Sequence, residues 1–393
     1  MKKLLVAVIF LVSTLTTAVM AEVKVGIILG FTGPIESLTP AMRDSAKIAF
    51  KEASDSGALL GGETISVLEG DSTCIDSAAA VATAEGQVSG GVAAIMGADC
   101  SGVTGAIATN VAVPNGVTMV SPSATSPGLT TLEDNGFFFR TAPSDARGGQ
   151  ILANIASDRG LNSVAITYTN NDYGKGLADV FEASFKANGG KVTTVTSHED
   201  GKGSYASEVA VLGSAGGDAL VVIGYLDQGG KGIIEDSVES GAFSTFVLSD
   251  GMIGQSIVDA IGGDLDGSFG SLPGTDSDGA TKFAGIAEAG GVDASGPYTG
   301  ESYDAAALIV LAMQAGGSAD RQSIADNIMG VANAPGDEIL PGELAKALKI
   351  LAGGGQINYQ GATDVELTDV GEASGSFKEV EVGGGKFNTV QIR

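Results

Sequence analysis

The sequence predicts an α/β fold with two doubly wound parallel-sheet lobes. Short apolar runs alternate with amphipathic helical stretches along most of the chain. The runs are apolar on both faces, which is typical of parallel strands covered by helices on two sides. There are enough of these units for two such sheets, and no low-complexity linker or solenoid repeat separates them. We therefore expect two packed domains, in keeping with a length of 393 residues.

The individual elements follow from local signals. The best helix candidate spans residues 39–57, with Thr39 as its cap, Pro40 in its first turn and Gly57 as its stop. Residues 172–190 and 227–241 are further helix candidates. The predicted strands are residues 24–29, 92–97, 117–120, 163–169, 219–225 and 245–250.

The C-terminal tail has a different pattern. Residues 363–370, 375–382 and 385–393 alternate apolar and polar side chains with a period of two. This alternation is typical of half-buried strands, so we expect three antiparallel edge strands in the tail.

The first 21 residues predict export. Lys2 and Lys3 precede an apolar stretch, and small residues lead to Ala21, as in a secretory signal peptide cleaved after that residue. The alternative is a membrane anchor, for which the apolar stretch is short. We expect the mature protein to be soluble and located in the periplasm. The formal charge of −26 disfavours nucleic acid and anionic membranes as partners.

The only two cysteines are Cys74 and Cys100. In an exported protein, such an isolated pair favours a disulfide over a metal or redox site. The entropy model gives a loop of this size about 3 to 4 kcal/mol of stabilisation.

Candidate site residues gather where the predicted strands end. In open parallel sheets, ligands bind at the carboxyl ends of the strands. Ser101, the packet "SPSAT" at 121–125, Tyr173, Tyr225 and Asp250 occupy these positions. Hydroxyls and free helix N–H groups suit a carboxylate, Asp250 suits an ammonium, and the aromatic rings suit an apolar body. The set therefore suits a small zwitterion.

Each of these residues also has a purely structural interpretation. Ser101 is suited to a helix cap, Asp250 to a turn, and a tyrosine at a strand end to packing. The packet "SPSAT" is also a loop composition. Only their joint placement favours a binding site.

Enzyme signatures are sparse. The single histidine, His198, lies in the polar sequence "SHED", and we expect it to be exposed to solvent. The sequence has no nucleophile elbow, no phosphate-binding loop, no dinucleotide fingerprint and no cluster with metal-ligand spacing. We therefore expect no catalytic residue, metal or cofactor, and a secreted α/β enzyme stays as a remote alternative.

Several motifs in order carry a family resemblance. They are "KVGIILGFTGP", the cysteine pair, "CS" before a helix, "SPSATSP", "FRTAPSD", "NNDYGKG", "GYLDQGG", "SDG" and "PYTGESYDAA". Together they resemble the periplasmic branched-chain amino-acid-binding proteins of ABC transporters, the leucine/isoleucine/valine type, over essentially the whole mature chain.

The resemblance implies a type I periplasmic binding fold whose lobes are joined by three crossovers and close on ligand by hinge motion. We expect lobe I at residues 22–142 and 274–355, and lobe II at residues 143–273 and 356–393. It also implies an amino-acid ligand, ABC-transporter permease subunits as partners, and a monomer.

The resemblance also assigns roles within the cleft. Ser101 and Thr125 would hold the α-carboxylate of the ligand, with Ala124 beside them. The backbone carbonyl of Ser123 and the carboxylate of Asp250 would hold the ammonium. Aromatic groups around the ligand would be Tyr173, Tyr225 and Tyr298.

Two departures from the family pattern concern specificity. Leu38 stands where an aromatic residue is expected, and Asp250 stands where the family has the longer Glu. With Tyr298 and the nearby Glu301, these changes leave open a polar or larger amino acid. A same-fold receptor for amides, ureas or aromatic acids, or a ligand-sensing partner of a signalling receptor, also stays open.

Overall fold

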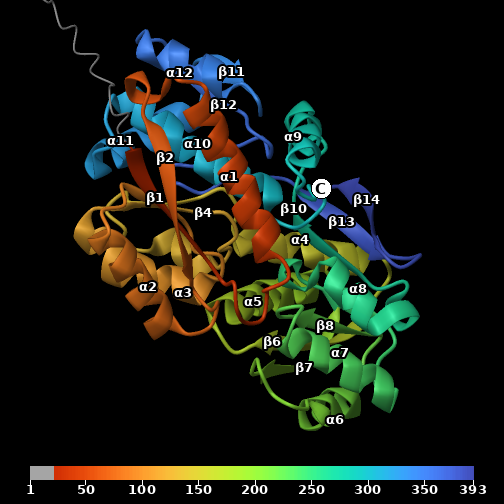
Figure 1. The fold of residues 1–393 in the computed structure, drawn as a ribbon. Coiled ribbons are helices and arrows are strands. Elements are labelled where there is room, and N and C mark those ends of the chain that lie inside the picture. The colour runs from red at the N-terminus through yellow and green to blue at the C-terminus, as the bar shows by residue number, and fades with distance from the viewer. Residues whose placement is uncertain (1–21) are drawn as a thin grey trace, which may run out of the picture.

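Two sheets organise the chain. A computed structural model of the protein describes residues 22–393, so the predicted signal peptide lies outside the described residues. One sheet has five strands in the order β2-β1-β3-β4-β5, and the other has seven in the order β14-β13-β10-β9-β8-β6-β7. A small third sheet pairs β11 with β12. Figure 1 shows the two large sheets in separate lobes, with helices around each.

Lobe I has an entirely parallel five-stranded sheet. Its strands are β1 (Glu22–Leu29), β2 (Thr64–Asp71), β3 (Ala94–Gly97), β4 (Thr118–Ser121) and β5 (Phe138–Arg140). Its helices are α1 (Thr39–Asp55), α2 (Ser77–Ser89), α3 (Ser101–Ile107), α9 (Asp278–Ala289), α10 (Thr299–Gly316), α11 (Arg321–Ala332) and α12 (Leu344–Ala352). The short strands β11 (Asp337–Ile339) and β12 (Ile357–Tyr359) lie beside α11 and α12.

Side chains along β1 alternate between the two faces of the sheet, and both faces are buried. Val25 and Ile27 belong to the core that contains α1 and the almost fully buried helix α10. Ile28 belongs to the core on the other face, which contains α2 and α3. A strand buried on both sides requires apolar residues at successive positions, and "KVGIIL" provides them.

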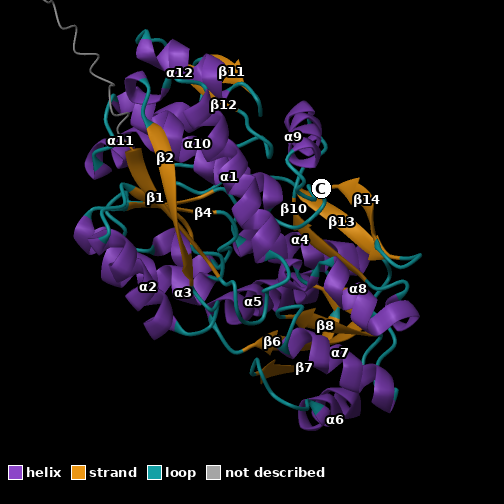
Figure 2. Cartoon of the chain, in the orientation of Figure 1, coloured by secondary structure: helices purple, strands orange, loops and turns teal. Residues whose placement is uncertain are grey.

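Lobe II has five parallel strands extended by an antiparallel hairpin. Its strands are β6 (Ser163–Thr169), β7 (Lys191–His198), β8 (Ala219–Ile223), β9 (Phe246–Leu248), β10 (Phe269–Pro273), β13 (Phe377–Val382) and β14 (Phe387–Ile392). Its helices are α4 (Asp145–Asp158), α5 (Asp172–Ala187), α6 (Ala206–Ala215), α7 (Gly229–Ser240) and α8 (Gln255–Ile261). Figure 2 shows the same alternation of helix and strand in both lobes.

The expected fold class is confirmed, and each predicted strand and helix before the tail is present with small shifts at its ends. Thr39 does not cap α1, because Leu38 holds the cap position and Thr39 is already helical. The hydroxyl of Thr39 instead donates to the backbone oxygen of Gly30 at 3.1 Å, which joins the helix to the end of β1.

The tail contains two of the three expected strands. Residues 375–382 and 385–393 include β13 and β14, which pair antiparallel at the edge of the sheet. Residues 363–370 do not form a strand; they form turns with an isolated bridge at Leu367. Their alternating apolar side chains, Val365 and Leu367, are buried in the core of lobe I instead.

The chain passes between the lobes near residues 141–144, 274–277 and 374–376. The domain boundaries remain a prediction. The third passage lies C-terminal to the boundary expected after residue 355. The pairing of β12 with β11 and the packing of residues up to Ala373 in the core of lobe I favour a boundary after residue 373 over the one expected after 355.

The two lobes contact one another along the cleft. Ser37 of lobe I donates its N–H to the carboxylate of Asp227 in lobe II at 2.9 Å. Asp227 in turn donates its own N–H to the carbonyl of Pro34 at 3.0 Å. The hydroxyl of Ser126 donates to the carbonyl of Asp172 at the start of α5, at 3.0 Å. These contacts describe a closed arrangement of the lobes.

Candidate functional site

A small cavity lies where the strand ends of the two lobes meet. Six of the eight predicted site residues line it: Ser101, Ser123, Tyr173, Tyr225, Asp250 and Tyr298. Ala124 and Thr125 do not line it, although they follow Ser123 directly and are buried. Sequence reasoning therefore identified residues that the fold brings together from both lobes.

Lobe I supplies the hydroxyl side of the cavity. Ser101 begins α3 directly after β3, and its hydroxyl oxygen accepts the N–H of Ser126 at 3.1 Å. Ser123 follows β4 and donates its hydroxyl to the carbonyl of Asp99 at 3.1 Å. Two neighbouring parallel strands thus end in a cross-linked pair of loops that present small hydroxyls to the cavity.

Lobe II supplies a carboxylate surrounded by phenols. Asp250 follows β9, is only 7% exposed, and accepts the Tyr173 hydroxyl at 2.7 Å on one carboxylate oxygen. Its other oxygen accepts the hydroxyl of Tyr298, which comes from lobe I just before α10. The Asp250 carboxylate therefore links α5, the end of β9 and the opposite lobe at one point.

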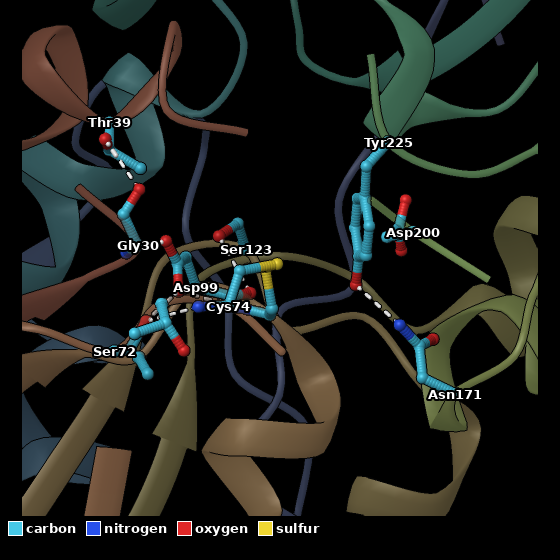
Figure 3. Close-up of a disulfide and its surroundings, with 12 residues drawn as sticks. Gly30, Thr39, Ser72, Cys74, Asp99, Ser123, Asn171, Asp200 and Tyr225 are labelled. Carbon is cyan, nitrogen blue, oxygen red and sulfur yellow. Dashed lines mark hydrogen bonds between the residues drawn. A yellow bond between two sulfur atoms is a disulfide. The ribbon is translucent and has the colours of Figure 1, made fainter. Parts of the chain in front are cut away.

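A pair of stacked rings forms the wall beside this carboxylate. The rings of Tyr173 and Tyr225 are 5.2 Å apart between centroids and are inclined by 18°. The hydroxyl oxygen of Tyr225 lies 3.5 Å from the side-chain nitrogen of Asn171, as Figure 3 shows. Burial raises the pKa of both phenols well above the usual value, so both are neutral; Tyr173 donates to Asp250, and Tyr225 accepts from Asn171.

Sequence reasoning missed a second buried acid, Asp145. It is the first residue of α4 and is only 4% exposed. One of its carboxylate oxygens has no hydrogen-bond partner within residues 22–393. Burial and the charge of the nearby Asp250 raise its pKa well above the usual value, and burial also raises the pKa of Asp250. Asp145 belongs to the quoted "FRTAPSD" motif, and its position after β5 at a lobe connection was the available signal.

Three aliphatic side chains also line the cavity, as does the buried acid Asp99. Ile35 and Leu38 precede α1, and Met42 belongs to its first turns. Leu38, which stands where the family pattern has an aromatic residue, therefore lines the cavity and adds an aliphatic side chain to its wall. Ile35 and Met42 carry no sequence signal that separates them from ordinary core residues.

Glu301 lies outside this cavity. It lines a larger adjoining groove, together with Lys378 of β13. Leu38 and Tyr298 line both spaces and separate them. Burial raises the pKa of Glu301 to about 7, and the charge of Lys378 opposes this rise.

The expected disulfide is present beside the cavity. Cys74 and Cys100 are bonded, with their Cα atoms 5.2 Å apart. Next to the bridge, the buried carboxylate of Asp99 accepts the N–H of Gly30 at 2.5 Å and the hydroxyl of Ser72 at 3.0 Å. Figure 3 shows this cluster, which fixes the ends of β1, β2 and β3 relative to one another.

The expectation that His198 is exposed was wrong. It is the last residue of β7, is 1% exposed, and its Nδ1 lies 2.8 Å from the hydroxyl of Thr167 on β6. The next residue, Glu199, is exposed, while the side chain of His198 points into lobe II and meets the ring of Tyr205 edge-on. Burial lowers its pKa to about 4, so the imidazole is neutral near pH 7.

Metal-binding clusters and membrane-spanning helices are both absent from the described part of the chain. No cluster of three or more His, Cys, Asp or Glu side chains in residues 22–393 could hold a metal ion. Across the same residues, none of the helices combines the length and apolar character needed to cross a membrane.

Comparison with known proteins agrees with this architecture. Residues 22–345 match the family model described as a periplasmic binding protein. A Leu/Ile/Val-binding protein homolog of Brucella melitensis is 29% identical over 311 residues, which cover 78% of this chain and 81% of that protein.

Solved structures show the shared fold. A leucine-binding protein from Thermotoga maritima superposes with a TM-score of 0.79 at 23% identity, covering 94% of this chain and 98% of that one. A solute-binding protein of an ABC transporter from R. palustris, in complex with benzoate, gives a TM-score of 0.76 at 19% identity, with 95% and 96% covered. From the match over most of its length, the chain belongs to the periplasmic binding protein family.

Proposed function

We propose that this chain is the exported solute-binding component of an ABC importer and that it binds a small amino acid between its lobes. One observation carries the proposal: the cavity between the lobes has small hydroxyls from lobe I and the buried carboxylate of Asp250 from lobe II. A ligand with a carboxylate and an ammonium at the two ends of its polar part complements this arrangement.

The buried carboxylate of Asp250 requires a positive partner. A charge removed from water costs several kcal/mol unless it is paired. The phenols of Tyr173 and Tyr298 satisfy part of this requirement by donating to Asp250, and a ligand ammonium would satisfy the rest. In this proposal Ser101 holds the ligand carboxylate, Thr125 supports it from the buried loop behind the cavity lining, and the Ser123 carbonyl adds to the ammonium site.

The aliphatic lining indicates the side-chain class. Ile35, Leu38 and Met42 offer apolar contact and no hydrogen-bonding side-chain group. Burial of a ligand hydrocarbon against them is favourable by about 25 cal/mol per Å². We therefore propose a branched-chain or related aliphatic amino acid, in line with the Leu/Ile/Val-binding homolog and the leucine-binding protein that this chain resembles.

An aromatic acid is a second candidate, and the stacked pair Tyr173 and Tyr225 favours it. The benzoate complex of a protein with this fold makes the same suggestion. Against it, an aromatic acid without an amino group would leave the Asp250 carboxylate beside a second anion. The amino acid is therefore the leading proposal, and it involves binding without chemical conversion.

A thermal-shift screen of the mature chain with amino acids, amides, ureas and aromatic acids tests this proposal. We expect the largest stabilisation from aliphatic amino acids, because a ligand stabilises the state that binds it. The same samples analysed by chromatography should return the ligand unchanged. Stabilisation by aromatic acids alone would replace the leading proposal with the second, and turnover of the ligand would replace both with an enzyme.

A further inference from the structure

Arg140 is a fully buried cation beside the predicted carboxylate site. It is the last residue of β5 and is only 1% exposed. Its Nη1 donates to the backbone carbonyl of Ala124 at 2.9 Å and to that of Ser126 at 3.0 Å. One nitrogen thus holds the backbone on both sides of Thr125.

Two further backbone groups of this loop are also hydrogen-bonded. The carbonyl of Thr125 accepts the N–H of Asp145 at 2.8 Å. The N–H of Ser126 donates to the hydroxyl of Ser101 at 3.1 Å. The buried Thr125 hydroxyl lies beside the carboxyl of Asp145. The loop therefore fixes its own backbone and, through the Ser126 N–H, the hydroxyl of Ser101, which lines the cavity.

The second terminal nitrogen of Arg140, Nη2, links this loop to the segment that leads into the third passage between the lobes. Nη2 donates to the hydroxyl of Thr130 at 2.8 Å and to the carboxylate of Glu372 at 2.5 Å. Thr130 also donates to the same Glu372 oxygen at 2.8 Å. The backbone of Arg140 pairs with Gly371 and Ala373, each at 3.0 Å. Arg140 and Glu372 directly precede the first and third passages of the chain between the lobes.

We propose that Arg140 is a positioning residue for recognition of the ligand carboxylate, an inference that rests on the proposed function. Its guanidinium sets the orientation of residues 124–126, and through the Ser126 N–H this loop fixes the Ser101 hydroxyl that lines the cavity. Its planar fork is essential, because two carbonyls, a hydroxyl and a carboxylate must be bound at once. A lysine ammonium has three donors on a flexible stem and cannot reproduce this geometry.

The test compares the variants Arg140→Lys and Thr130→Val by calorimetry with L-leucine and L-leucinamide, or with the free and amidated forms of the amino acid that gives the largest shift in the screen. We expect Arg140→Lys to lower the affinity for the free acid at least tenfold and the affinity for the amide no more than threefold. Thr130→Val should lower the affinity for the free acid by about threefold, because it removes one acceptor of Arg140 and changes no group that touches the ligand.

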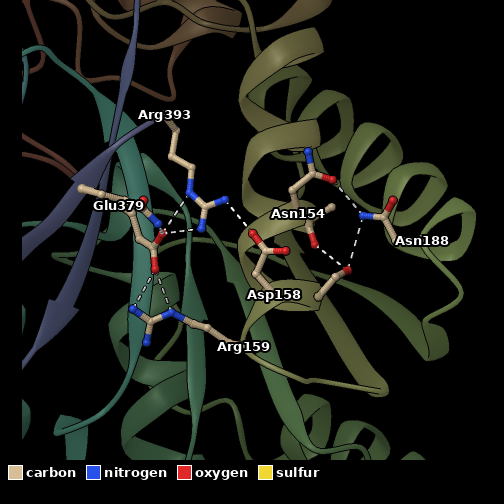
Figure 4. A network of polar contacts seen from close by, with 9 residues as sticks. Asn154, Asp158, Arg159, Asn188, Glu379 and Arg393 are labelled. Atoms are coloured by element: carbon tan, nitrogen blue, oxygen red, sulfur yellow. Dashed lines mark hydrogen bonds and ion pairs between the residues drawn. The ribbon is translucent and has the colours of Figure 1, made fainter.

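Arg159→Lys is the control. Arg159 donates to Glu379 at 2.9 and 2.8 Å and to Glu381 at 2.5 Å, in the network of Figure 4. It lies in lobe II and lines neither the cavity nor the groove. We expect this variant to lower the melting temperature of the empty protein and to leave both affinities within twofold of wild type.

The outcomes are distinguishable. If both test variants lower stability as the control does and keep the wild-type ratio of acid to amide affinity, Arg140 is only structural and the inference is overturned. If Arg140→Lys does not fold, the ratio measured for Thr130→Val decides. If the wild-type chain binds no amino acid, the proposed function fails first and this inference fails with it.

Discussion

Replacing Asp250 with asparagine removes the charge of the predicted ammonium site and keeps its shape. The Asp250 carboxylate is 7% exposed and already accepts the Tyr173 hydroxyl at 2.7 Å and the Tyr298 hydroxyl. In Asp250→Asn a bound ammonium would lie in the closed cavity without a counter-charge. Truncating one partner of such a buried pair costs about 2 to 5 kcal/mol.

A loss of about 3 kcal/mol corresponds to an affinity roughly a hundredfold lower. The variant amide can still accept one phenol hydroxyl, so one of the two tyrosines loses its acceptor. That loss costs the empty protein about 1 kcal/mol. Calorimetry with the best amino acid from the screen measures the loss of affinity, and thermal unfolding without ligand measures the loss of stability.

Asp200→Asn is the matched control for this variant. Asp200 is a largely buried acid of the same lobe that accepts the Thr169 hydroxyl at 2.6 Å and the N–H of Gly229 at 3.0 Å. It does not line the cavity, so we expect stability to fall and affinity to stay near wild type. If Asp250→Asn binds the amino acid within threefold of wild type, the ammonium site is in the wrong place and the reasoning fails.

Further predictions concern the bridge, the interlobe contacts and the buried histidine. Replacing both Cys74 and Cys100 with serine should lower the free energy of unfolding by about 3 to 4 kcal/mol, and thiol labelling of the denatured wild-type protein should find no free cysteine. Small-angle scattering should show a smaller radius of gyration with ligand than without, because a ligand that contacts both lobes favours the closed state. Asp227→Ala removes the acceptor of the Ser37 N–H, so we expect closure to weaken and affinity to fall about tenfold, by about 1.4 kcal/mol; unchanged affinity would show that this contact does not contribute to closure. The pKa of His198 is about 4 when folded and 6.5 as its ordinary value, so its contribution to stability is present above pH 6.5 and is lost as the pH falls toward 4. Between these values the wild type should lose about 3 kcal/mol relative to His198→Gln, and parallel stability curves for the two proteins would contradict the assignment.

The sequence predicted the fold class and the strand ends because those depend on short-range patterns. Runs such as residues 163–169 and 219–225 must be buried on both faces, and the helices between them place their carboxyl ends on one edge. This was sufficient to bring Ser101, Ser123 and Asp250 to one cavity. The disulfide could be predicted because the sequence indicates an exported protein and contains only two cysteines.

Other features depend on contacts that distant segments make. His198 is buried because β6 offers Thr167 to its ring, which a polar local sequence does not indicate. Residues 363–370 have a strand pattern, but their apolar side chains find a place in the core of lobe I without a strand partner. Arg140 pairs with Glu372, 232 positions away, so no local pattern could reveal its role.

The central claim is that the cavity recognises both charged ends of an amino acid. Titration of the mature chain with L-leucine, L-leucinamide and N-acetyl-L-leucine tests this claim most directly, because the amide lacks the carboxylate and the acetylated form lacks the ammonium. We predict that the free amino acid binds one per chain and that each blocked form binds at least a hundredfold more weakly. Equal affinity for the free and blocked forms, or binding of none of them or of any other free amino acid, would contradict the account.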